Sequence, residues 1–518
     1  RLSGRVELTL GAEQTAHLQK AHVLPTNDSA KYTWDVELRT EVKALFTSEG
    51  FVDRVGTDVE TIGVVMSDTS FYAESGGQES DIGTLIVTAA DGSVVELEVL
   101  DVQVYGGYVL HTCAALHDSQ SLQGLSVHSP VTAKVNYQRR RQTAPNHTMT
   151  HVLNFALREV LGVSVDQKGS AVSFEKLRFD FGLNRGLKAT ELERIERQIN
   201  QIISEGQTVH SQVLPLEQAQ KIPGLRAVFG EVYPDPVRVI SVGQDAMDGA
   251  LSSVEFCGGT HILNTKEAQA FVLLEESAIA KGIRRIIGVT GTAALSAQEL
   301  GDQLEVQAAD LQARLQELQR KKSVDVEGLD ALVTQLRKDV DAAVVSSVLK
   351  VRLRDSLESL QKSIYAIKSE ALMQKVEAEA LLLREQLVSL VEKGVSQAVL
   401  VVNVGSEARA IKRINDEIKS IAPNLSYLLV SADDTKVSVF AHSLQPDRLR
   451  ANDWVTAALQ DLPGARGGGK ANTAQGSAIV GSVATNDEAG KDCQNVVMKE
   501  AVRGINQAAN KFTSQLGL

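Results

Sequence analysis

The 518-residue chain is poor in cysteine and in aromatic residues, and it lacks any long hydrophobic run. Three cysteines (Cys113, Cys257 and Cys493) are too few for a disulfide framework, which indicates a reducing compartment. Without a run of about 18 apolar residues, no membrane-spanning helix is expected. The first residues, RLSGRVELTL, have neither a start methionine nor the form of a signal peptide. We therefore expect a cytoplasmic protein, without a membrane partner, that begins inside a longer one.

The composition favours long helices and several domains. Hydrophobic residues make up 43% and aromatic residues 4% of a chain this long, which predicts two to four domains rich in aliphatic side chains. The net charge of −12 argues mildly against a nucleic-acid ligand, but phosphate affinity depends on local patches. Each basic patch is small and is by itself more typical of a solvated surface. The patches are Arg139, Arg140 and Arg141; Lys281 with Arg284 and Arg285; and Arg466 with Lys470.

The spacing of apolar residues predicts an α+β multidomain protein. Short alternating runs broken by Gly, Asp and Ser are typical of a small barrel, and apolar residues at helical spacing follow from about residue 147. The predicted parts are a mixed segment (1–45), a β-barrel (46–140), an α+β domain (141–291), a long helical hairpin (292–394) and a compact α/β carboxy-terminal domain (395–518).

Two helical segments have recognisable limits. A helix at 188–205 has Thr190 as its predicted cap and Glu193 as its capping-box partner. In the hairpin, leucines at near-heptad spacing predict one helix up to a break near Ser323–Gly328 and a second helix over 329–393. Considered alone, this region is most simply a spacer or a dimer stalk.

Two residue pairs share the spacing of metal ligands. His147 and His151 lie four residues apart on a predicted helix, so both imidazoles project from the same helix face. Cys257 and His261 repeat the spacing across two glycines, which favour a turn. Together the pairs supply the four corners of a tetrahedral site, and nitrogen and sulfur ligands favour zinc over magnesium or calcium.

Other interpretations remain open at this point. An isolated HxxxH is commonplace on helices, and Cys257 could be a small core residue. Thr148 stands where a zinc protease has its general-base glutamate. Four protein ligands are typical of a structural zinc, whereas catalysis needs three ligands and a water, so the spacing permits both roles.

A glycine-rich segment lies near the carboxyl end. It is not a nucleotide P-loop, because Ala471 follows its lysine. Exposed backbone amides beside two cations suit phosphate or stacked-base contacts, and a flexible surface loop is the alternative. The residues concerned are Arg466, Gly467, Gly468, Gly469 and Lys470.

A combination of motifs resembles one enzyme family. FYAESGGQESDIG (71–83), NHTMTHVLNFALREVLG (146–162), QKGS (167–170) and FCGGTHI (256–262) resemble the editing domain of the alanyl-tRNA synthetases. GARGGGKANTAQGS (464–477) resembles their carboxy-terminal tRNA-binding domain. PTNDSAKY (25–32) and EVYPDPVRVISVG (231–243) look like the eukaryotic cytoplasmic form.

This resemblance implies one zinc ion, held by the HxxxH and CxxxH pairs, and hydrolysis of the ester of Ser-tRNA(Ala) and Gly-tRNA(Ala). It places Gln167 in the editing pocket and makes the Thr148 and Thr150 hydroxyls candidates for sensing serine. It gives the basic patches a tRNA to bind and puts the glycine-rich loop on the outer corner of that tRNA. It also implies that 1–45 is the tail of a preceding tRNA-binding region and that 141–291 is the zinc-containing editing domain. The aminoacylation domain, which uses ATP and Mg2+ to ligate alanine, has no motif that we find in this chain.

Alternatives are a free-standing editing hydrolase and a non-catalytic tRNA-binding protein with a structural zinc. The threonyl-tRNA synthetases have a related zinc domain, but that resemblance would not supply the long helices and the GGGK segment. We expect tRNA(Ala) as the partner, no DNA, and possible sites of self-association in the helical hairpin or the carboxy-terminal domain.

Overall fold

The computed structural model describes residues 8–56, 59–88, 92–116, 122, 125–162, 165–227, 232–246, 253–321, 326–432, 436–480 and 488–518. Its internal contacts divide the chain into two compact units, which are described separately below. Unit 1 comprises Arg1–Asp310 and Thr334–Leu357, and unit 2 comprises Leu311–Val333 and Glu358–Leu518. None of the described helices is long and apolar enough to cross a membrane.

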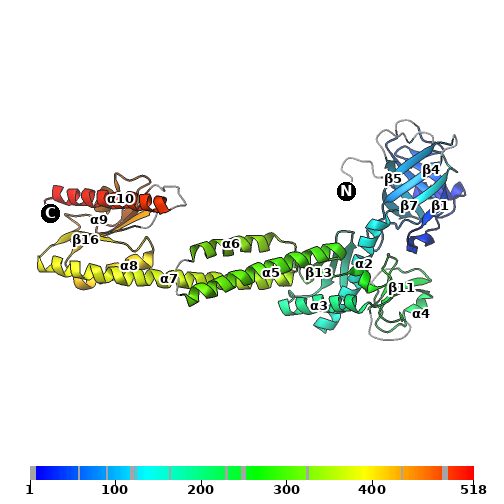
Figure 1. Ribbon diagram of the computed structural model, residues 1–518. Coiled ribbons are helices and arrows are strands. Elements are labelled where there is room, and N and C mark those ends of the chain that lie inside the picture. The colour runs from blue at the N-terminus through cyan, green and yellow to red at the C-terminus, as the bar shows by residue number, and fades with distance from the viewer. Residues whose placement is uncertain are drawn as a thin grey trace. The chain divides into compact units, whose positions relative to one another are not determined.

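Unit 1 begins with a closed antiparallel barrel, as the sequence predicts (Figure 1). The strand order is β1-β3-β6-β5-β4-β7, and β7 pairs back to β1, with Leu38 opposite Ala133. Alternate residues of β5, such as Leu97 and Val99, fill the interior. The barrel already includes residues from Glu37, which the sequence assigned to the preceding segment. The elements are α1 (Ala12–Lys20), η1 (Ser29–Tyr32), β1 (Glu37–Thr47), β2 (Gly50–Val52), β3 (Thr61–Met66), β4 (Gly83–Thr88), β5 (Val94–Tyr105), β6 (Tyr108–Ala115) and β7 (Pro130–Val135).

The second part of unit 1 packs two helices against two small antiparallel sheets. Helix α2 (Tyr137–Leu161) is capped by the Asn136 side chain, which accepts from the Arg139 amide, and it ends at Gly162 with φ of 63°. The sheets have the orders β13-β14-β9-β8 and β10-β11-β12. Their elements are β8 (Gln167–Val172), β9 (Leu177–Gly182), α3 (Ala189–Glu205), β10 (Val209–Leu214), α4 (Leu216–Ala219), β11 (Val237–Val242), β12 (Ser253–Phe256), η3 (Thr265–Ala268), β13 (Phe271–Ala280) and β14 (Ile283–Thr290).

The predicted cap of α3 is wrong by two positions. The helix begins after Lys188, and the carboxylate of Glu191 accepts from the Lys188 amide at 2.8 Å. Thr190 therefore lies inside the first turn, and Glu193 pairs with Arg197 one turn along the helix. Glu191 therefore takes the position three residues after the cap that the prediction gave to Glu193.

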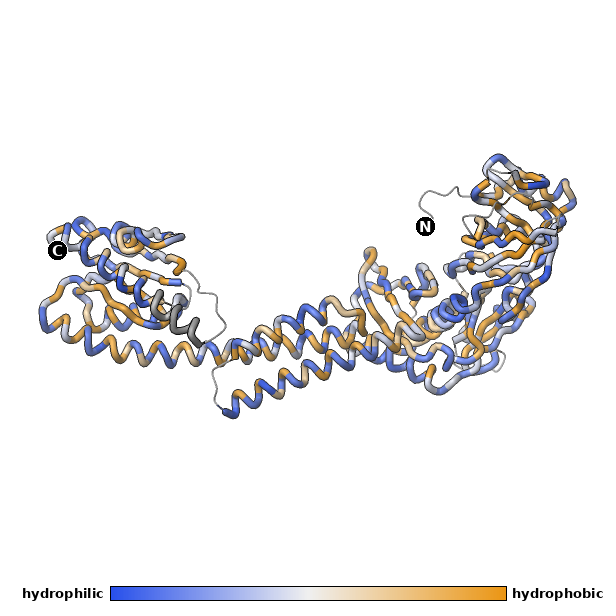
Figure 2. Tube along the Cα trace, turned by 45° about the horizontal axis from the view of Figure 1, so that its top comes forward, coloured by the Kyte–Doolittle hydropathy of each residue, from blue (hydrophilic) through white to orange (hydrophobic). Residues whose placement is uncertain are grey.

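The long helical region contains a break that the sequence did not predict. Helices α5 (Gly291–Arg320), α6 (Glu327–Ala342) and α7 (Ser347–Glu392) replace the expected two-helix hairpin, because the predicted second helix stops after Ala342. Two β-branched residues, Val344 and Val345, precede Ser346, whose hydroxyl donates to Glu196 at 3.1 Å and whose carbonyl starts α7. Apolar and polar residues alternate along these helices (Figure 2). Part of the predicted break near Ser323–Gly328 lies outside the described residues.

Unit 2 contains an α/β domain, as the sequence predicts. The sheet order is β15-β16-β17-β19-β18, with β15 and β16 parallel and the other pairs antiparallel. Helix α8 and the end of α7 pack in one apolar cluster, and α9 and α10 pack in another. The glycine-rich segment is a β-hairpin here and not a loop. The elements are β15 (Gln397–Val402), α8 (Ala408–Ile421), β16 (Ser426–Ala432), β17 (Lys436–His442), α9 (Ala451–Leu459), β18 (Arg466–Gly469), β19 (Thr473–Ile479) and α10 (Glu488–Gln515).

Candidate metal centre

The two predicted ligand pairs meet in unit 1. His147 and His151 lie on α2, and Cys257 and His261 lie in the loop after β12. One ligand atom from each lies within 4.8 Å of the others, and we call this group the four-donor site. Cys257 Sγ is 3.3 Å from Nε2 of His147 and 3.3 Å from Nε2 of His261. Tetrahedral zinc with ordinary bond lengths needs edges of about 3.3–3.6 Å, so this group could hold a metal ion.

Each imidazole also has a polar neighbour on its other nitrogen. His147 Nδ1 is 2.6 Å from Gln78 Oε1, and His261 Nδ1 is 3.1 Å from the Thr148 hydroxyl. His151 Nδ1 lies 3.5 Å from a carboxylate oxygen of Glu255 without a hydrogen bond to it. An acceptor at Nδ1 keeps the proton there and leaves Nε2 as the ligand atom, which is how histidines are oriented at metal sites. The donor set and its surroundings therefore fit a metal.

Burial favours the uncharged forms of these groups. It lowers the pKa of His151 to about 3, with further lowering by Arg226 and Arg238. Burial likewise lowers the pKa of His147 and His261, so their imidazoles are neutral ligands at pH 7. Burial raises the pKa of the Cys257 thiol to about 12, and a bound cation would favour its thiolate.

The loop that carries Cys257 is anchored by two side chains. Arg238 on β11 donates from Nη1 to the carbonyls of Cys257 (3.1 Å) and Gly259 (2.7 Å). The hydroxyl of Tyr32, which ends η1, donates to the carbonyl of Gly258 at 3.0 Å. The loop thus has a fixed backbone before any ligand arrives, which lowers the entropic cost of forming the site.

Thr148 holds a ligand in place. Its hydroxyl donates to the Ala144 carbonyl, and its lone pairs face the amide of Ile262 and Nδ1 of His261. A hydroxyl has one donor and two acceptor positions, and these three contacts occupy them. Thr148 therefore orients His261 in this structure, and its role in sensing serine stays a prediction.

The other two predicted pocket residues stay predictions. The Thr150 hydroxyl donates to the Asn146 carbonyl one turn back on α2 at 2.8 Å. Gln167 begins β8 and donates to the Ser170 hydroxyl at 3.2 Å. Neither contact brings these side chains to a ligand atom of the four-donor site.

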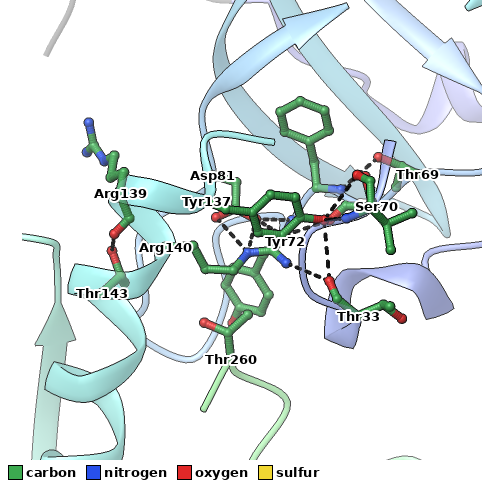
Figure 3. Close-up of polar contacts among 12 residues, drawn as sticks. Thr33, Thr69, Ser70, Tyr72, Asp81, Tyr137, Arg139, Arg140, Thr143 and Thr260 are labelled. Atoms are coloured by element: carbon green, nitrogen blue, oxygen red, sulfur yellow. Dashed lines mark hydrogen bonds and ion pairs between the residues drawn. The ribbon is translucent and has the colours of Figure 1, made fainter. Parts of the chain in front are cut away.

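The three arginines of the predicted basic patch, Arg139, Arg140 and Arg141, differ in burial. Arg140 is 1% exposed and is enclosed by Asp81 and the carbonyls of Ser70 and Thr33 (Figure 3). It joins α2 to the barrel and is not open to a phosphate. Its neighbours are more accessible. They form ion pairs, Arg139 with Glu79 at 2.8 Å and Arg141 with Asp35 at 2.6 Å.

The remaining predicted cations lie elsewhere. Arg284 pairs with Glu276 and Arg285 with Asp180, both across neighbouring strands of one sheet. In unit 2, residues 466–470 are all exposed, and the residues that make up the predicted contact are Arg466, Gly467, Gly468, Gly469 and Lys470.

Comparison with known proteins decides the family. A curated relative named "Alanine--tRNA ligase, cytoplasmic" from Dictyostelium discoideum is 37% identical over 489 residues, which are 91% of this chain and 50% of that protein. "Alanine--tRNA ligase" from Schizosaccharomyces pombe is 34% identical over 92% of this chain and 49% of its own length. The chain belongs to the alanine–tRNA ligase family. It spans about half the length of these relatives.

Three family models match parts of this family member. The model described as tRNA synthetases class II (A) matches residues 5–139, and the threonyl and alanyl tRNA synthetase second additional domain matches 237–287. The DHHA1 domain matches 394–491. The first match covers all the barrel strands, from β1 to β7, where the motifs had pointed to the editing module alone. A solved C-Ala domain from Aquifex aeolicus alanyl-tRNA synthetase matches 20% of this chain and 87% of its own length, at 15% identity and a TM-score of 0.14. This similarity is too low to assign a fold.

Sequence reasoning missed Gln78 as part of the site. This residue closes a turn of the barrel in which Gly76 and Gly77 have positive φ, and the Gly77 carbonyl accepts from Val172 on β8. The amide of Thr260 also donates to Gln78 Oε1, and Gln78 Nε2 donates to the Thr260 hydroxyl, both at 2.9 Å. The barrel therefore supplies a polar partner to the metal centre. The signal available was its place in the FYAESGGQ motif.

We expect Gln78→Leu to weaken zinc binding by about 10–100-fold, because His147 would lose the acceptor that fixes its ring. Competition with a chromogenic chelator measures the affinity. The matched control is Gln103→Leu, since Gln103 hydrogen-bonds to Glu74 and Asp101 on the barrel surface. Equal zinc affinity in the two variants would contradict the role of Gln78.

Proposed function

We propose that this chain is the editing half of an alanyl-tRNA synthetase and hydrolyses the ester of Ser-tRNA(Ala) and Gly-tRNA(Ala) at a zinc site. The observation that carries the proposal is the four-donor site. Two of its residues, Cys257 and His261, lie in the segment that matches the threonyl and alanyl tRNA synthetase second additional domain. An alanine pocket admits glycine and rejects one added hydroxyl poorly, so a second hydrolytic site restores fidelity.

The chemistry divides between the metal and the chain. When bound, zinc would supply a Lewis acid for the ester carbonyl or for a water. The two residue pairs would hold it, and Gln78 and Thr148 would orient the imidazoles of His147 and His261. Gln167, Thr148 and Thr150 are the proposed pocket residues that contact the aminoacyl group.

The rest of the molecule has proposed roles in tRNA binding. We assign residues 46–140 and 141–291 to the editing module, 292–394 to a spacer, and 395–518 to a tRNA-binding domain. The exposed cations Arg466 and Lys470, with the more accessible Arg139 and Arg141, are the proposed phosphate contacts. The complete protein would ligate alanine with ATP and Mg2+ in the cytoplasm, and self-association through the hairpin or carboxy-terminal domain would be compatible with that role.

One observation favours a second candidate. Four protein donors are typical of a closed structural zinc site, which would make the chain a tRNA-binding protein without hydrolytic activity. Under that alternative the metal stabilises the fold, and the ester of a mischarged tRNA survives.

We expect the zinc-loaded chain to deacylate Ser-tRNA(Ala) at least about 100-fold faster than Cys257→Ala, and to spare Ala-tRNA(Ala), because the variant loses a ligand. Release of labelled serine measures the rate. Cys113→Ala is the matched control, since Cys113 lies in the barrel interior next to His111. If Ser-tRNA(Ala) survives with the zinc-loaded chain as long as in buffer, the hydrolase proposal fails and the structural-zinc candidate stands.

A further inference from the structure

Tyr32 reaches the metal centre from a distant part of the sequence. It is the last residue of η1, and its hydroxyl donates to the carbonyl of Gly258, the residue after Cys257. Contacts of the residues that follow Tyr32 fix this segment, because the Thr33 carbonyl accepts from Arg140 at 3.3 Å and the Val36 amide donates to the Tyr137 hydroxyl at 3.2 Å. The tyrosine ring therefore has a defined position at the rim of the four-donor site.

Arg238 covers one face of this ring. Its guanidinium carbon lies 4.1 Å from the ring centroid, while its Nη1 is held by the Cys257 and Gly259 carbonyls and its Nε donates to the Ser211 hydroxyl at 2.9 Å. The guanidinium is therefore part of a stack and cannot swing away. The attraction between a guanidinium and an aromatic face stabilises this stack.

Tyr32 is an exposed aromatic residue. It is 38% exposed although its hydroxyl is bonded and Arg238 lies over its ring. Lys31 adds a second cation, with Nζ 5.2 Å from the ring centroid and an ion pair to Asp28. Tethering Gly258 requires the hydroxyl alone, and it does not account for an exposed tyrosine beside two cations.

We propose that Tyr32, backed by Arg238, is the stacking platform for the terminal base of an RNA 3′ end whose ester is presented to the four-donor site. The inference rests on the proposed function. In a 3′-aminoacylated nucleotide one ribose separates the ester from the base, so an ester at the metal brings the base to the rim formed by Gly258. Proteins hold single-stranded RNA ends by stacking their bases on aromatic rings and guanidinium planes.

The test uses the zinc-loaded full chain and an uncharged RNA hairpin that ends in CCA, with 2-aminopurine replacing the last adenine. Stacking quenches this base, so a titration reports both binding and contact. We expect Tyr32→Ala to weaken binding about 5- to 150-fold and to abolish the quenching, whereas Tyr32→Phe keeps the ring and the quenching. Tyr365→Ala, at a tyrosine that is 62% exposed on α7, is expected to match the unaltered chain.

Several results would overturn the platform. They are unchanged binding by Tyr32→Ala, a Tyr32→Phe variant as defective as Tyr32→Ala, and loss of zinc together with binding in Tyr32→Ala, which would assign the residue to holding the metal loop. Hydrolysis is read separately. If the unaltered chain leaves Ser-tRNA(Ala) intact while quenching still depends on Tyr32, the proposed function fails and the platform stands. If hydrolysis proceeds without that dependence, the platform alone fails.

Discussion

Replacing Gly259 with alanine is expected to lower the zinc affinity by at least about 100-fold and to remove deacylation with it. A Cβ at this position would lie 2.0 Å from Cε1 and 2.3 Å from Nδ1 of His147, and 2.9 Å from Oε1 of Gln78. These distances are shorter than any van der Waals contact of a Cβ atom. Because His147 is buried, its imidazole must leave its position. One added methyl group therefore displaces a ligand and its polar partner together.

The adjacent glycine provides the control. A Cβ at Gly258 would meet nothing within 4 Å, and the Gly258 carbonyl that accepts from Tyr32 would remain. We expect Gly258→Ala to bind zinc as tightly as the unaltered chain, measured by chelator competition and by metal content after dialysis. Equal losses in the two variants would show that the loop needs both glycines for flexibility and not Gly259 for space.

Replacing Arg140 with methionine is expected to destabilise unit 1 by about 3–5 kcal/mol. Arg140 and its partner Asp81 are 1% and 7% exposed, and removal of the guanidinium leaves a buried carboxylate without its countercharge. The carbonyls of Ser70 and Thr33 lose a donor at the same time. Arg141→Met is the matched control, because Arg141 and Asp35 are 55% and 61% exposed, and such a pair contributes about 0–1 kcal/mol.

A local probe is available for this measurement. Trp34 lies against both Arg140 and Tyr137, and the chain has one other tryptophan, Trp454 in unit 2. In a Trp454→Phe background, urea unfolding followed by tryptophan fluorescence reports on the surroundings of Trp34. Similar midpoints for the Arg140 and Arg141 variants would contradict a structural role for the buried arginine.

Local patterns in the sequence pointed to the residues of the four-donor site, whose role as metal ligands stays a prediction. His147 and His151 share a helix face because of a four-residue spacing, and the glycines after Cys257 indicated the turn that the loop makes. The barrel was also predictable, since alternation over short runs is a local property. The family resemblance supplied the expectation that the two ligand pairs meet.

Long-range pairing could not be predicted in the same way. Gln78 is 69 residues from His147, and nothing in a glutamine indicates which distant imidazole it faces. Arg140 looks like its neighbours in a basic run, and the direction of α2 against the barrel decides that it is the buried one. The break before α7 depends on a hydroxyl that finds Glu196 on another helix.

Helix α2 sets the spacing between the barrel and the four-donor site. Arg140 fastens it to the barrel and His147 projects into the metal centre seven positions later, which is about two helical turns. A residue inserted between them would rotate every later side chain by about 100°, so the imidazoles would turn away while the arginine stayed in place. An insertion or deletion between Arg140 and His147 would therefore separate the barrel contact from the four-donor site.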